Sequence, residues 1–158
     1  MKKIILILAL LTIIYSCTKE TDDKVTKTED MAATLEYTGK WELVKMTGSF
    51  IGSETTGSDM EWQETYLINE DESFVKTRVR GDSTTLASGT YALKDVEGLW
   101  NMGFATKDIE LSYDIKNNII GNCSSNKTIE YLYFSTDHRL ISTWNACDGP
   151  GLEYVKSK

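Results

Sequence analysis

The sequence predicts an all-β domain over residues 39–158, folded as an antiparallel up-and-down β-barrel of about eight strands. Three observations lead to this prediction. Short segments rich in Val, Ile, Thr, Tyr, Phe and Trp alternate with turn residues along this whole stretch. In residues 108–115, polar and apolar side chains alternate with the period of two that a half-buried strand requires. No window has the period of an amphipathic helix.

The candidate strands follow one another with short connections. Turn-forming residues separate them, for example at 69–72, 81–83 and 135–137. Short connections favour pairing between chain neighbours, and closing the sheet removes the edges that an open sheet would expose. Residues 96–106 are irregular and are read as a long loop or a short helical turn. The expected strands are residues 40–50, 61–68, 73–80, 85–93, 107–115, 117–122, 128–135, 138–146 and 151–156.

The first residues have the pattern of an export signal. Lys2 and Lys3 form a short positive region, and residues 4–14 are apolar apart from Thr12. This run of about 11 residues is too short for a membrane-spanning helix, which needs about 20. It has the length of the apolar region of a signal peptide.

The end of this signal resembles a bacterial lipobox. Residues 14–17 place a branched apolar residue three positions before Cys17 and a small residue directly before it. The resemblance implies a lipoprotein signal peptide over residues 1–16, cleavage before Cys17 and lipidation of its thiol. The departure is Tyr15, where a small residue is usual. An ordinary secretory signal with an unrelated cysteine is the alternative.

Residues 17–38 are expected to be the lipidated cysteine and a flexible tether. The segment has many charges and few apolar residues, so it cannot bury a core of its own. The acyl chains would hold the protein at the bacterial outer membrane without spanning it. Glu20, Asp22 and Asp23 resemble the acidic signal of surface-displayed lipoproteins in Bacteroidota, but polar tethers are often acidic. The cell surface and the periplasmic face therefore both remain open.

Charge and cysteine content narrow the function further. The net charge of −7 argues against binding nucleic acid through its phosphates. We expect no metal and no cofactor, because the chain has one His and no CxxC motif. Cys123 and Cys147 are expected to form a disulfide in an oxidising compartment, closing a loop of about 24 residues worth about 3 kcal/mol. The bridge should form where the chain leaves the sheet. Two free buried thiols are the alternative.

Residues 39–41 read Gly-Lys-Trp, which resembles the Gly-x-Trp motif of lipocalins and their calycin relatives. The resemblance implies that Gly39 opens the first strand and that Trp41 plugs the closed end of the barrel. Residues 130–156 are similar to the C-terminal part of lipocalin-like lipoproteins of Bacteroidota. The body is shorter than a typical lipocalin, and no candidate exists for the large helix that packs beside that barrel.

The aromatic residues of the body predict a ligand pocket at the end opposite Trp41. A small hydrophobic or aromatic ligand would bind there in a monomeric, non-enzymatic protein. In the alternative, the same rings fill the barrel, and the protein is a structural or accessory cell-surface protein that binds another protein. The predicted lining is Tyr66, Tyr91, Tyr113, Tyr131 and Trp144, and the predicted rim is Trp62, Trp100 and Phe104.

Lys76, Arg78 and Arg80 share one face of an expected strand. We expect this face to be solvated. In the alternative, it is a cationic stripe that meets a carboxylate or a phosphate. His138 follows Asp137, but adjacent residues point apart, so the two do not form a catalytic dyad.

Overall fold

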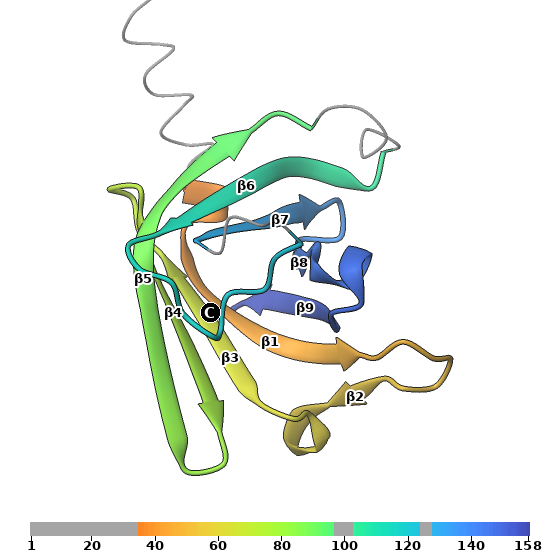
Figure 1. The fold of residues 1–158 in the computed structure, drawn as a ribbon. Helices are drawn as coiled ribbons and strands as arrows, with labels where there is room; N and C mark the ends of the chain where they lie inside the picture. The colour runs from red at the N-terminus through yellow and green to blue at the C-terminus, as the bar shows by residue number, and fades with distance from the viewer. Residues whose placement is uncertain (1–34, 97–102, 124–127) are drawn as a thin grey trace, which may run out of the picture. The chain divides into compact units, whose positions relative to one another are not determined.

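The computed structural model describes residues 35–96, 103–123 and 128–158, and regular structure in these residues is almost entirely β (Figure 1). The order of the strands in the sheet is β2-β1-β3-β4-β5-β6-β7-β8-β9, and β9 also pairs with β1. Eight antiparallel strands therefore form a closed barrel, with β2 as an extra strand beside β1, and the predicted fold class is confirmed. The strands are β1 Gly39–Thr47, β2 Thr55–Thr56, β3 Gln63–Ile68, β4 Ser73–Arg80, β5 Ser83–Lys94, β6 Ala105–Tyr113, β7 Ile129–Ser135, β8 Arg139–Ser142 and β9 Gly151–Lys156.

The barrel closes on β1. The first half of β1, from Gly39 to Glu42, pairs with β3, and nearly its whole length pairs with β9 on the other side. A bulge between Leu43 and Lys45 bends the strand, as closure of a small barrel requires. The second half of β1 pairs with β2 instead of β3. This eight-stranded arrangement is compatible with a lipocalin-like fold.

Aromatic side chains pack together at the barrel end at which β1 begins. The Phe134 ring lies between those of Tyr37 and Trp41, with centroid distances of 4.6 and 5.2 Å. The indole nitrogen of Trp41 donates a hydrogen bond to the Tyr37 carbonyl at 2.9 Å. The structure thus places Trp41, which is 3% exposed, in the interior of this end.

Strands β5 and β6 pair over only half of β5. Residues Gly89–Lys94 pair with β6, whereas residues 83–88 pair with β4 alone. The chain leaves β6 after Tyr113 and crosses the barrel as residues 114–123, which we call the cap segment (Figure 1). Residues 117–122 were expected to form a strand, and this prediction is wrong. The Asn117 side chain bonds to the Leu86 carbonyl and the Ile119 amide, and it holds the chain in an irregular path.

Other expected elements differ at their ends. Residues 138–146 divide into β8 and a 3₁₀ helix, η3 (Trp144–Cys147), so the expected strand stops at Ser142. The short β2 was not predicted; it precedes a second 3₁₀ helix, η1 (Gly57–Asp59). The predicted signal peptide (residues 1–16), Cys17, nearly all of the tether and Trp100 lie outside the described residues. In the described ranges, no helix has the length and apolar character needed to cross a membrane.

Candidate functional site

The middle of the barrel contains four charged side chains, which we call the interior charge cluster. Glu64 lies on β3, Lys76 and Arg78 lie on β4, and Glu130 lies on β7. Strand alternation directs all four inward, and the β3–β4 register sets Glu64 opposite Arg78. Lys76 and Glu130 have no solvent exposure. Such groups are rare in a protein interior, because each charge loses its hydration and needs a partner there.

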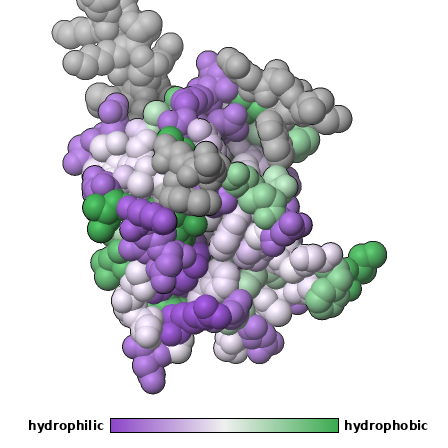
Figure 2. Space-filling model, viewed as in Figure 1, coloured by the Kyte–Doolittle hydropathy of each residue, from purple (hydrophilic) through white to green (hydrophobic). Residues whose placement is uncertain are grey.

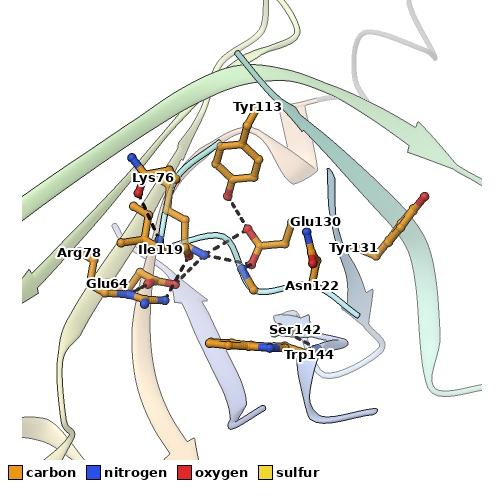
Figure 3. Close-up of polar contacts among 12 residues, drawn as sticks. Glu64, Lys76, Arg78, Tyr113, Ile119, Asn122, Glu130, Tyr131, Ser142 and Trp144 are labelled. Atoms are coloured by element: carbon orange, nitrogen blue, oxygen red, sulfur yellow. Dashed lines mark hydrogen bonds and ion pairs between the residues drawn. The ribbon is translucent and has the colours of Figure 1, made fainter. Parts of the chain in front are cut away.

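Lys76 links the two carboxylates of the cluster (Figure 3). Its ammonium nitrogen lies 3.1 Å from Glu64 Oε1 and donates to Glu130 Oε1 and Oε2 at 3.0 and 3.1 Å. The same nitrogen lies 4.9 Å from the ring centroid of Tyr66, which is opposite Lys76 in the β3–β4 register. The ammonium is therefore held by two opposite charges and one aromatic face.

Arg78 completes the charge balance. Its Nε donates to Glu64 Oε2, and its Nη2 donates to the carbonyl of Ile119 in the cap segment at 3.2 Å. Its guanidinium carbon lies 4.2 Å from the ring centroid of Trp62. Two carboxylates thus face two cations, and the cluster carries no net charge. The prediction that this face of β4 is solvated is wrong for Lys76 and Arg78, because both side chains point into the barrel. The prediction is right for Arg80, which is exposed at the strand end.

Three tyrosines surround the cluster. Tyr154 donates to Glu64 Oε1 at 2.6 Å, and Tyr113 donates to Glu130 Oε2. Tyr66 is fully buried, and its hydroxyl has no hydrogen-bond partner among the described residues. Burial raises the pKa of all three phenols well above the ordinary value, and the negative charges of Glu64 and Glu130 raise it further. The three tyrosines are therefore neutral over the whole physiological range, and Tyr113 and Tyr154 remain hydrogen-bond donors to the carboxylates.

The cap segment closes the barrel over the cluster. Ile119 is buried, and the Gly121 amide donates to Glu130 Oε1 at 3.1 Å. Gly121 lies directly against Trp144 of η3: a Cβ at this position would lie 2.7 Å from the indole ring and 2.9 Å from Glu130 Oε1. Only glycine fits between the indole and the carboxylate. The segment is therefore bonded to the cluster through its own backbone.

The predicted disulfide joins the cap segment to η3. Cys123 and Cys147 are bridged with a Cα–Cα distance of 5.5 Å. Both cysteines lie outside the strands, so the bridge forms where the chain has left the sheet, as expected. This position connects the only covalent crosslink among the described residues to the segment that covers the interior charge cluster.

The structure separates the predicted ligand-binding residues. Tyr66, Tyr113 and Trp62 lie in the interior beside the charge cluster, and Trp144 packs against the cap segment. Tyr91 is buried, but its hydroxyl donates to the Asn69 carbonyl, in the β3–β4 turn at the same end of the barrel as Trp41. The predicted lining therefore does not gather at one open end.

Tyr131 was expected in the interior, and this prediction is wrong. Its side chain is 44% exposed on the outer face of β7, while its neighbours Glu130 and Leu132 point inward. The predicted rim residue Phe104 is 39% exposed, and its ring lies 6.2 Å from that of Tyr133. Sequence reasoning missed Glu64, Lys76, Arg78 and Glu130 as interior groups. The sequence contained a signal for Glu130, because this residue falls on the same face of the strand as the apolar residues Leu132 and Phe134.

Two hollows in the described part of the molecule are lined by residues at opposite ends of β1. One, of about 690 Å³, lies between the β1–β2 turn and Pro150. The other, of about 330 Å³, lies beside Tyr37, Trp41 and Phe134 at the end where β1 begins. Neither is lined by any of the residues predicted to bind a ligand.

Comparison of the chain with protein-family models, with curated proteins and with solved structures found no match. The site must therefore be interpreted from its own geometry.

Proposed function

We propose that this chain is a non-enzymatic, lipid-anchored accessory protein of the bacterial outer membrane, whose barrel is a filled scaffold and whose partner is another protein. The observation that carries the proposal is the interior charge cluster under the cap segment. Two carboxylates, two cations and the hydroxyls of Tyr113 and Tyr154 satisfy one another in the space that a hydrophobic ligand would need. Displacing them would leave buried charges unpaired, which is costly.

The first experiment tests whether the interior admits a ligand. The purified protein is titrated with a panel of lipids, haem and aromatic metabolites while its tryptophan fluorescence is recorded. A filled barrel predicts no saturable quenching, because Trp62 and Trp144 are packed against protein groups. Saturable quenching that disappears in a variant of the interior, such as Tyr113→Phe, would reject the filled scaffold in favour of ligand transport.

A second candidate function is the binding of a small polar molecule within the barrel. It is favoured by two buried donors, the Tyr66 hydroxyl and the Trp62 indole nitrogen, which lack partners among the described residues. Buried polar groups are normally satisfied, and unpaired ones occur at functional sites. Native mass spectrometry of the protein purified under mild conditions tests this candidate: a bound mass that Tyr66→Phe removes would favour it over the filled scaffold.

The proposed anchor is tested separately. Cys17→Ser should release the protein into the soluble fraction or leave it as an uncleaved precursor, because the acylated thiol is lost. Ser16→Ala is the matched control, since it keeps a small residue before the cysteine and should leave membrane attachment unchanged. Attachment of Cys17→Ser that resists salt washing would contradict the lipoprotein assignment. Proteinase treatment of intact cells then distinguishes the cell surface from the periplasmic face.

A further inference from the structure

The β1–β2 turn, residues 48–54, displays two large apolar side chains to solvent. Phe50 is 75% exposed and Ile51 is fully exposed at the tip. Figure 2 shows this apolar tip projecting from the right edge of the molecule. Single exposed apolar groups are common on protein surfaces, whereas larger contiguous apolar patches mark contact surfaces. Phe50 and Ile51 are adjacent in the turn and both exposed.

The turn is held in this conformation by its own hydrogen bonds. The Ser53 hydroxyl accepts from the Gly48 amide at 2.8 Å and donates to the Phe50 carbonyl at 2.6 Å. The Ser53 amide also donates to the Phe50 carbonyl at 3.2 Å. Side chains of serine commonly stabilise turns in this way. The display of Phe50 and Ile51 is therefore a built feature of the hairpin.

A groove of about 690 Å³ lies at the base of this turn. Met46, Phe50 and Pro150 give it apolar surface, and Glu54 and Asp59 are among the residues that line it. This volume lies within the range of small-molecule sites, which is about 300–1,000 Å³. We call it the hairpin groove.

The charge of the hairpin groove is negative. Its lining includes the carboxylates of Glu54, Asp59 and Glu61 and no basic side chain. Two cations lie nearby: Arg80 pairs with Glu61, and Lys45 pairs with Glu153 and lies 3.7 Å from Glu54. The whole chain has a net charge of −7. An anionic lipid surface or a second copy of the chain would bring like charges together here, whereas a basic partner would be attracted.

We propose that the hairpin groove binds an extended peptide segment of a partner protein that carries basic residues on both sides of an apolar one. The apolar side chain would pack on Met46, Phe50 and Pro150, and the basic side chains would meet the carboxylates of Glu54 and Asp59. The inference rests on the proposed function, because it specifies the partner class of an accessory protein.

The test uses the purified full chain and fluorescein-labelled synthetic peptides, with binding followed by fluorescence anisotropy. The basic–apolar probe has the sequence Lys-Lys-Phe-Val-Lys-Lys. Two matched probes replace its lysines by glutamates or its Phe-Val by Ser-Ser. We expect saturable binding of the first probe and at least tenfold weaker binding of the other two. Binding of all three probes with similar affinity, or of none, would overturn the proposal.

Variants then locate the site. The double substitution Phe50→Ser and Ile51→Ser, and separately Glu54→Lys, should each weaken binding of the basic–apolar probe at least tenfold. All three side chains are exposed, so the fold should persist, and circular dichroism checks this. The controls are Leu86→Ser, an exposed apolar residue of β5, and Glu70→Lys, in the β3–β4 turn at the other end of the barrel. Equal losses in the controls would place the binding elsewhere.

Two further outcomes would also reject the proposed occupant. Self-association in sedimentation experiments that the Phe50→Ser and Ile51→Ser substitutions abolish would identify a second copy as the partner. Flotation with phosphatidylglycerol vesicles that the same substitutions abolish would identify a membrane surface. Failure of the peptide test leaves the filled barrel intact, since that is measured by ligand titration of the interior.

Discussion

Lys76 is the residue on which the barrel interior depends most. Its ammonium group pairs with Glu64 and Glu130 at once, and its side chain has no exposure to solvent. Replacing a buried ion pair by apolar groups can be neutral, but removing one partner leaves a buried charge alone. The cluster therefore makes the interior intolerant of single changes.

Lys76→Met is expected to lower the free energy of unfolding by about 3–5 kcal/mol, because two buried carboxylates lose their shared cation. Arg80→Met is the matched control on the same strand: Arg80 is mostly exposed and pairs with Glu61 at the surface, so its loss should cost less than about 1 kcal/mol. Urea unfolding followed by tryptophan fluorescence measures both. Similar effects of the two substitutions would contradict the role assigned to Lys76.

Removing the hydroxyl of Tyr66 and removing that of Tyr154 should affect the free energy of unfolding differently. Tyr154→Phe removes a hydrogen bond to the charged Glu64 and should cost about 1.5–3 kcal/mol. Tyr66→Phe removes a buried hydroxyl that has no partner among the described residues, so stability should be unchanged or slightly higher. The same urea experiment compares them. A large loss in Tyr66→Phe would indicate that its hydroxyl has a partner in solution.

At this scale the sequence predicts which side chains share a face, but not which face is inside. In residues 130–135, one alternating set is Glu130, Leu132 and Phe134, and the other begins with Tyr131 and Tyr133. Choosing Tyr131 as interior was wrong, because a charged residue such as Glu130 can enter a barrel when an opposite charge on another strand meets it. Those strands are 54 residues apart in sequence, and local patterns do not carry that pairing.

The cap segment shows that local sequence also fails to predict where a whole strand ends. Ile119 and Ile120 read as part of a strand over residues 117–122, and the structure packs both against the hydrophobic core. They nevertheless pack into the barrel from an irregular segment, because β6 ends at Tyr113 and leaves residues 83–88 of β5 without a strand partner on that side. The end of a strand depends on its neighbour's length, which the segment's own sequence does not contain.

The Cys123–Cys147 disulfide tethers the cap segment to η3. The double substitution Cys123→Ser and Cys147→Ser should lower the free energy of unfolding by about 3 kcal/mol, from the loop entropy of 24 residues. It should also speed hydrogen exchange of the Gly121 amide, which bonds to Glu130, more than that of the Leu132 amide in β7. If stability falls while both amides keep their relative protection, the bridge constrains only the unfolded chain and does not hold the cap.

For the whole molecule, the fold class was predictable because it depends on many weak signals that agree. Period-two alternation and short turns each recur along the body, so errors at single strands do not change the result. Closure of the barrel followed from the need to remove edges, and the β1–β9 pairing provides it. The sequence does not decide between a filled interior and a ligand pocket, because the same aromatic residues fit either one.

The stability of the whole barrel should fall in alkaline solution. The raised pKa of Tyr66, Tyr113 and Tyr154 keeps them neutral in the folded state, while in the unfolded chain they ionise at about pH 10. The stability that the three neutral tyrosines contribute to the folded state is therefore complete below about pH 9. It is lost as the pH rises from about 10 towards their raised pKa values in the folded protein. Above pH 10 each should lower the free energy of unfolding by about 1.4 kcal/mol per pH unit.

Tyr66→Phe isolates one of these contributions, because this variant shares the lysine titrations of the parent chain and should match its stability at neutral pH. Urea unfolding at pH 8, 9, 10 and 11 should give equal free energies for the two proteins up to about pH 9. Above pH 10 the slope for the variant should be shallower by about 1.4 kcal/mol per pH unit. Equal slopes would mean that Tyr66 ionises alike in both states, and hence that the barrel interior is open to water.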